Sequence, residues 1–189
     1  MDRTQYLGYT PVTESRRLIA NGLPEALPET LGGRHRFTPL SLHVGERIAA
    51  AAFARLDDVG SFRLDVWLLS QARAGRWHVR SGSTTAADPG DEDVLAPRPA
   101  AAVLDGHAQA GESTRYDTRS SRWIPWPPKW LAFCLVRLSA EVGAVRVDGA
   151  EIRVPEHGLQ ALAWWPDRNG TSVELLDHKG ERISTLSLR

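Results

Sequence analysis

The sequence predicts an all-β protein, an antiparallel β-sandwich of immunoglobulin-like or jelly-roll-like type with a short N-terminal helical arm. Apolar and polar residues alternate over several short stretches from Arg34 onward, which is typical of half-buried strands. Turn residues separate these stretches at short intervals. A helical period does not recur after the arm, so the pattern favours strands throughout the remainder of the chain.

Residues 1–33 form the predicted arm. We expect a helix over residues 14–20, with Thr13 as its N-cap and Gly22 just beyond its end. Two Leu-Pro dipeptides follow and forbid a longer helix. Because the arm carries several leucines, we expect it to lie across the β domain rather than to extend into solvent.

The predicted strands share short length and alternating or continuous apolar character. They cover residues 40–44, 47–57, 62–70, 75–81, 131–139, 159–165, 173–176 and 182–188, together with a hairpin over residues 145–154. Within the long polar segment before residue 123, the pattern allows a further strand over residues 101–104 alone. The alanines of residues 47–57 also suit a helix, but the segment lies between strands and ends in a turn sequence. We expect residues 62–70 and 75–81 to pair as a hairpin, and residues 131–139 to form a central strand.

The strongest local pattern is the hairpin over residues 145–154. Asp148-Gly149 suits a two-residue type I′ turn, which requires positive φ at both positions. With that turn, Val145 faces Ile152 on the inner side of the sheet, and Arg146 faces Glu151 on the outer side. A register shift by one residue would mix the two faces, so the sequence specifies this register.

Residues 34–189 are expected to form the β-sandwich domain. An alternative is two sheet units, residues 34–84 and 123–189, joined by a long loop over residues 85–122 that is rich in polar residues and proline. The strand over residues 182–188 would offer an exposed edge, which allows a homodimer.

Composition excludes several classes of protein. The 189 residues carry 23 basic and 23 acidic side chains, which argues against a simple basic nucleic-acid binder. Cys134 is the one cysteine, so the chain is not a disulfide scaffold. The apolar runs are too short to span a membrane, and the first residues resemble no secretory signal. We therefore expect a cytoplasmic protein.

Three of the seven tryptophans lie close together in a proline-rich loop that also carries basic side chains. The candidate binding residues are Arg119, Arg122, Trp123, Trp126, Lys129 and Trp130. Proline keeps such a loop extended, and exposed indoles with nearby arginines are typical anchors for a protein partner. Alternatives are that the indoles cap an open end of the sandwich core, stack on sugars or bases, or lie at a membrane interface.

The sequence contains no recognisable motif for catalysis, for metal binding or for cofactor binding. The six histidines lack the spacing of a metal site, and neither a nucleophile elbow nor a phosphate-binding loop occurs. We expect Cys134 to be a buried, unreactive thiol. His43 and His78 are predicted on outer strand faces, and with His107 and Asp105 they form the set that folding would have to bring together in an enzyme.

The sequence thus predicts a non-catalytic cytoplasmic binding or regulatory protein that contacts a protein partner through the loop over residues 119–130, without metal or cofactor. One alternative is a small-molecule-binding protein or a hydrolase-type enzyme with a pocket at one end of the sandwich. Another is an immunity or antitoxin-type protein.

Overall fold

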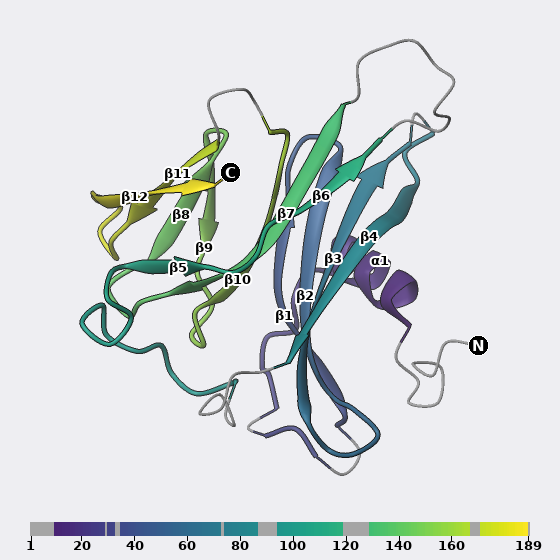
Figure 1. Cartoon of the computed structure of the whole chain (residues 1–189), viewed down its shortest axis with the longest axis horizontal. Helices are drawn as coiled ribbons and strands as arrows, with labels where there is room; N and C mark the ends of the chain where they lie inside the picture. Colours follow the sequence, from purple (N-terminus) through teal and green to yellow (C-terminus); the bar gives the residue numbers. More distant parts are fainter. Residues whose placement is uncertain are drawn as a thin grey trace.

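The computed structural model describes residues 10–28, 30–32, 35–72, 74–86, 94–118, 129–166 and 171–188. Over these residues the chain forms one helix and three four-stranded sheets whose strand pairs are all antiparallel (Figure 1). The predicted all-β class is confirmed.

The N-terminal sheet is a meander with the strand order β1-β2-β3-β4. Its strands are β1 (Phe37–Val44), β2 (Ile48–Leu56), β3 (Phe62–Gln71) and β4 (Trp77–Ala86). The predicted hairpin is confirmed as the β3–β4 pair, although β4 continues five residues beyond the expected end at residue 81.

The middle sheet has the order β10-β7-β5, and β6 also pairs with β7. Its strands are β5 (Ala108–Ala110), β6 (Thr114–Asp117), β7 (Trp130–Leu138) and β10 (Leu159–Trp164). All six residues of β10 are buried, as are most of β7. The prediction of a central strand over residues 131–139 is confirmed, because other layers cover both faces of β7.

The C-terminal sheet has the order β12-β11-β8-β9, so β12 is an edge strand. Its strands are β8 (Ala144–Val147), β9 (Ala150–Arg153), β11 (Thr171–Leu176) and β12 (Arg182–Leu188). The β8–β9 hairpin has the predicted register, and an Arg146 guanidinium nitrogen lies 3.1 Å from a carboxylate oxygen of Glu151. Asp148 and Gly149 have φ of 50° and 80°, as the predicted turn requires.

The helix and the sheets stack in four layers, with α1 on one side of the N-terminal sheet and the middle sheet between the other two (Figure 1). Adjacent residues of β7 belong to different cores, because successive side chains point to opposite faces of a sheet. Leu131 and Phe133 pack toward the N-terminal sheet, whereas Cys134 and Val136 pack toward the C-terminal sheet.

Strand β2 explains the run of alanines that also suited a helix. The interpretation as a strand is confirmed, and all residues from Ile48 to Ala54 are buried. Ala50 and Ala52 face the middle sheet, whereas Ala49 and Ala51 face the layer of α1. Small side chains on both faces let the flanking layers approach closely, which a strand with large side chains would prevent.

Helix α1 (Pro11–Asn21) begins three residues earlier than predicted. The predicted cap at Thr13 is wrong, because Thr10 occupies the N-cap and Pro11 stands in the first turn, where a backbone N–H has no helical partner anyway. The predicted end is confirmed at Gly22, whose φ is 80° and whose N–H donates to the Leu18 carbonyl oxygen at 2.7 Å. The fully buried Leu18 side chain attaches the helix to the N-terminal sheet.

The described part of the long segment before β7 also differs from expectation. The predicted strand over residues 101–104 is wrong, because these residues form turns. The segment instead contributes β5 and β6, which pair with β7 through Ala108 opposite Leu138 and Thr114 opposite Phe133. Both strands are short and partly polar, so their conformation depends on the partner strand rather than on a hydrophobic pattern of their own.

Candidate functional site

The aromatic and basic loop that the sequence singles out connects β6 to β7. Four of its predicted binding residues lie outside the described residues: Arg119, Arg122, Trp123 and Trp126. The other two, Lys129 and Trp130, are exposed, and Trp130 retains 43% of its accessible surface. The backbone N–H and the hydroxyl of Thr118 both donate to the Lys129 carbonyl oxygen, at 3.0 and 2.7 Å. This clamp fixes the two ends of the loop at one end of the middle sheet.

Two further exposed apolar side chains lie at the same end of the molecule. Trp164 pairs with Ala132, so Trp165 follows at the end of β10 where β7 begins. Trp164 is fully buried, whereas its neighbour Trp165 is 43% exposed. Val44, at the end of β1, is 47% exposed. We call Val44, Trp130 and Trp165 the apolar end.

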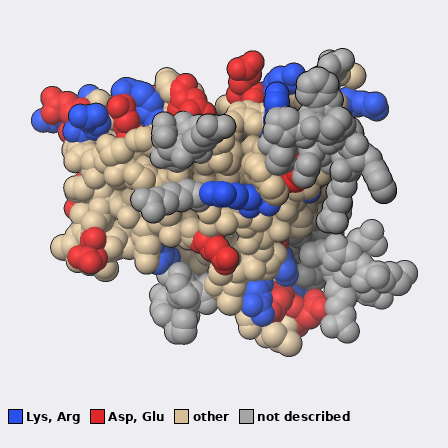
Figure 2. All heavy atoms as spheres, turned by 45° about the horizontal axis from the view of Figure 1, so that its top comes forward, with Lys and Arg blue, Asp and Glu red and all other residues tan. Residues whose placement is uncertain are grey.

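Figure 1 shows the end of β1, the start of β7 and the end of β10 in the upper part of the molecule. Figure 2 turns this side toward the viewer. Residues other than Lys, Arg, Asp and Glu cover much of the visible face, with a basic and an acidic patch in its middle and further charged side chains along its upper and lower borders. Exposed aromatic and apolar side chains that gather at one end of a fold are typical of an interaction site.

Beneath the apolar end, side chains rather than a backbone ladder join β1 to β10. Ser41 Oγ accepts from the Ala161 N–H at 2.8 Å, and His43 Nδ1 accepts from the Ala163 N–H at 3.0 Å. We call these contacts the β1–β10 seam. They satisfy two backbone donors on the edge of β10 that faces away from β7, and buried donors are costly when unpaired. The seam therefore fixes the positions of Val44 and Trp165 relative to each other.

The prediction that His43 lies on an outer strand face is wrong, since the residue is 3% exposed. An irregularity between Pro39 and Ser41 changes the alternation, so Leu42 packs on the side of α1 and His43 points to the edge of β10. Burial lowers the pKa of His43 to about 4, and the negative charge of Asp148 opposes this shift only in part. His43 is therefore a neutral acceptor at pH 7.

The residues of the enzyme alternative are not brought together by the fold. His43 is on β1 and His78 on β4, at opposite edges of the N-terminal sheet. Asp105 and His107 lie in the turn that precedes β5. Within the described part of the chain, hydrogen bonds do not join any two of these four side chains.

Cys134 is buried in the core between the middle and C-terminal sheets, as expected. Burial raises the pKa of the Cys134 thiol to about 12. The thiolate, which is the nucleophilic form, is therefore scarce near neutral pH. Cys134 therefore packs in the core as a small apolar side chain.

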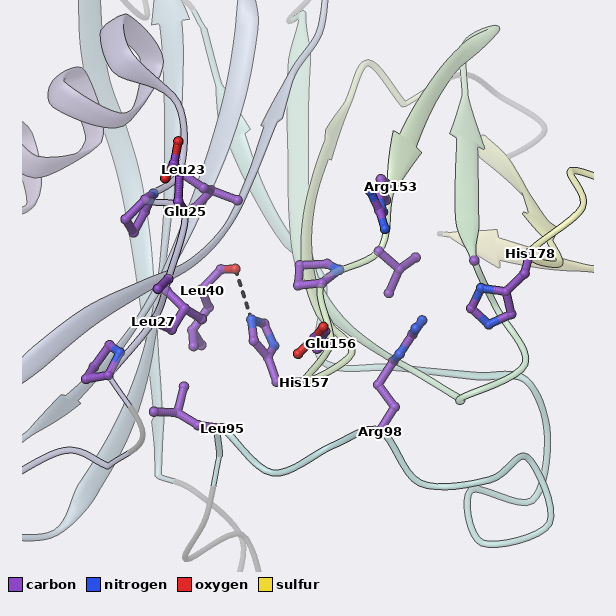
Figure 3. A pocket seen from close by; sticks show the side chains of 16 residues that line it. Leu23, Glu25, Leu27, Leu40, Leu95, Arg98, Arg153, Glu156, His157 and His178 are labelled. Carbon is purple, nitrogen blue, oxygen red and sulfur yellow. Dashed lines mark hydrogen bonds between the residues drawn. The ribbon is translucent and has the colours of Figure 1, made fainter.

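A groove of about 1010 Å³ lies at the other end of the β1–β10 seam, where Leu40 and His157 line it. Sequence reasoning missed it, because its lining comes from segments far apart in the chain. The wall formed by the arm includes Leu23, Leu27 and one acidic side chain, Glu25, whereas the opposite wall carries Arg98, Arg153 and His178 (Figure 3).

His157 lies between the two walls but has no free ring nitrogen. Its Nδ1 accepts from the Leu159 N–H at 3.1 Å, so Nε2 carries the proton and donates to the Leu40 carbonyl oxygen at 3.0 Å (Figure 3). Burial lowers the pKa of this imidazole, which favours the neutral form. His157 therefore links β1 to the start of β10 and is not poised as a catalytic base.

Among the described residues, no group of three or more His, Cys, Asp or Glu side chains is placed so that it could hold a metal ion. The described part of the chain likewise contains no helix long and apolar enough to cross a membrane. Comparison with protein-family models, curated proteins and solved structures finds no match for this chain.

Proposed function

We propose that this protein is a non-catalytic cytoplasmic binding or regulatory protein, and that it contacts a protein partner through the loop over residues 119–130 and the apolar end beside it. The observation that carries the proposal is that Val44, Trp130 and Trp165 are all exposed at the end of the fold from which this loop starts. Tryptophan is among the residue types most enriched in the energetically dominant centres of protein interfaces.

Charge adds a requirement on the partner. Residues 115–130 carry four basic side chains and one acidic one, Asp117. Arg115, which precedes the loop, and Lys129, near the end of the loop, are both exposed. A partner that covers the apolar end would therefore match it best with an apolar centre and acidic side chains around that centre. Added salt should slow association, because rim charges act mainly on the rate of encounter.

The proposal is tested by affinity capture from native cytosol, with wild type beside the variant in which Trp123, Trp126 and Trp130 are alanine. We expect a protein that co-purifies with wild type and is lost from the variant. The variant's free energy of unfolding should stay within about 1–2 kcal/mol of wild type, the range of ordinary surface substitutions. A larger loss of stability would mean that the indoles close the core, which contradicts the proposal.

A matched pair of valine substitutions controls for general changes in surface hydrophobicity. Val44→Ser alters the apolar end, whereas Val59→Ser alters a side chain that is 85% exposed in the β2–β3 turn, at the opposite end of β2. Val44→Ser should weaken binding of the captured protein and Val59→Ser should not. Equal effects of the two substitutions would refute a site at the apolar end.

A further inference from the structure

The groove beside His157 contains a half-buried cation, Arg98, whose side chain is held in place by several contacts. The backbone N–H of Arg98 donates to the Glu156 carbonyl oxygen at 3.0 Å. A Cβ added at Gly158, whose φ is 75°, would lie 2.5 Å from Arg98 Cγ, so the arginine side chain packs directly on this glycine. One guanidinium nitrogen, Nη1, donates to the Val142 carbonyl oxygen. These contacts place the guanidinium on the groove wall (Figure 3).

The charge of Arg98 is only partly compensated by the protein. Among the described residues, no carboxylate oxygen lies within 4.0 Å of the Arg98 guanidinium. Glu156 and Glu141 are nevertheless near enough to favour its charged form. Burial acts in the other direction and lowers its pKa. A guanidinium has five N–H donors in a planar fork that fits a carboxylate in bidentate fashion. Among the described residues, the Val142 carbonyl oxygen uses one of these donors.

Arg153 adds a second cation to the wall that carries Arg98, and Glu25 adds an anion to the wall formed by the arm. Arg153 and His178 lie on the same wall as Arg98, and Glu156 lies between this wall and His157 (Figure 3). Glu25 is on the arm, across the groove from Arg98 (Figure 3). His178 Nε2 donates to the Ala140 carbonyl oxygen at 2.9 Å, which orients its ring. An anionic group would therefore be placed best beside Arg98 and Arg153.

The wall across from Arg98 carries leucine side chains and one carboxylate, Glu25. Leu23 and Leu27 come from the arm and Leu95 from the segment that leads to Arg98, whereas Leu40 of β1 is only 1% exposed. Prolines alternate with the leucines in the arm, and a proline has no backbone N–H to offer a ligand. A peptide backbone in the groove would need hydrogen-bond partners along its length, whereas an alkyl chain needs none.

We propose that the groove binds an alkyl carboxylate of medium chain length, a free fatty acid, with its carboxylate on the Arg98 guanidinium and its chain against Leu23, Leu27 and Leu95. Arg153 adds long-range attraction for the anion. A volume of about 1010 Å³ is ample for such a ligand. This site is separate from the apolar end and does not depend on a protein partner.

The test is calorimetric titration of the full chain with decanoate, decan-1-ol and butanoate, each below the concentration at which it self-associates. Decanoate should bind and saturate at one site. Decan-1-ol should bind at least about tenfold more weakly, since its hydroxyl has neither the negative charge nor the second oxygen with which a carboxylate pairs with a guanidinium. Butanoate should bind at least about a hundredfold more weakly, because it lacks six methylene groups. Equal affinity for decanoate and decan-1-ol, or no decanoate binding, would overturn the proposal.

Variants locate the site. Arg98→Lys keeps the charge and most of the stem but loses the planar fork, so decanoate affinity should fall about tenfold. Leu23→Ser should weaken the binding of decanoate and lower the ratio of decanoate affinity to butanoate affinity. Val103→Ser, at a side chain that is 75% exposed and outside the groove lining, is the matched control and should change neither. Wild-type affinity in Leu23→Ser, checked as folded by thermal unfolding, would contradict the proposed wall even if Arg98→Lys fails to fold.

Discussion

Single residues explain several features of this fold that its composition leaves open. Gly82 lies opposite Trp67 in the β3–β4 pair, and a Cβ added at Gly82 would be 2.3 Å from two carbons of the indole ring. The tryptophan ring therefore covers the glycine. A half-exposed indole on a sheet needs such a small neighbour, or it must turn toward solvent.

We expect Gly82→Ala to lower the free energy of unfolding by about 1–3 kcal/mol, because the added methyl group forces the Trp67 ring from its place. Urea-induced unfolding measures the change. Gly32→Ala is the matched control: the added Cβ would meet no atom within 4 Å, and the backbone there has no unusual φ. If both substitutions had the same effect, close packing of the Trp67 ring would not be the cause.

At the scale of elements, buried ion pairs and exposed ones differ in what they contribute. Arg55 on β2 and Asp65 on β3 lie 2.8 Å apart, and the Asp65 side chain is only 1% exposed. Arg17 and Glu14 on α1 lie at the same distance, but the Arg17 side chain is 47% exposed. Water screens the Arg17–Glu14 pair. Removal of Asp65, by contrast, would leave the Arg55 charge without its partner in a place that water solvates poorly.

Asp65→Ala should therefore destabilise the protein by about 3 kcal/mol or more, and Glu14→Ala by less than about 1 kcal/mol. Chemical denaturation of both variants tests the difference. The double variant Arg55→Met/Asp65→Leu should recover much of the loss, because it removes both charges and keeps apolar volume. Failure of this rescue would mean that Asp65 acts through contacts other than the Arg55 pair.

For the whole molecule, the β1–β10 seam couples the N-terminal sheet to the middle sheet. Its histidine must stay neutral, because Nδ1 of His43 accepts from a backbone N–H. The pKa of His43 is about 4 in the folded protein, against an ordinary value of 6.5. Between these pH values the unfolded chain binds a proton that the folded chain does not, so the free energy of unfolding falls as the pH drops.

We expect the contribution of His43 to be complete above pH 6.5 and to be lost progressively toward pH 4, by about 3 kcal/mol in total. The lowered pKa of His157 acts in the same direction. His43→Asn offers an amide oxygen in place of Nδ1 and should make the pH dependence shallower, as measured by urea unfolding at pH 7 and pH 4.5. His78→Asn on β4 is the control, and an equal flattening in that variant would contradict this assignment.

The sequence by itself determined those elements whose cause is local. The β8–β9 hairpin follows from Asp148-Gly149, since few residues adopt positive φ and the alternation of flanking residues permits a single register. The end of α1 at Gly22 has the same kind of cause. Strands with a clear apolar pattern, such as β7 and β10, were also predicted, because their burial on both faces appears as a continuous apolar run.

Only the tertiary structure decided the features that depend on pairing between distant segments. Strands β5 and β6 exist because β7 supplies their hydrogen-bond partners, and His43 is buried because β10 presents unpaired N–H groups to it. The apolar end combines residues from β1, β7 and the end of β10, and the groove combines the arm with Arg98 and His178. Sequence periodicity reports which face of an element is apolar, but not which other element covers that face, and this choice positions both candidate sites.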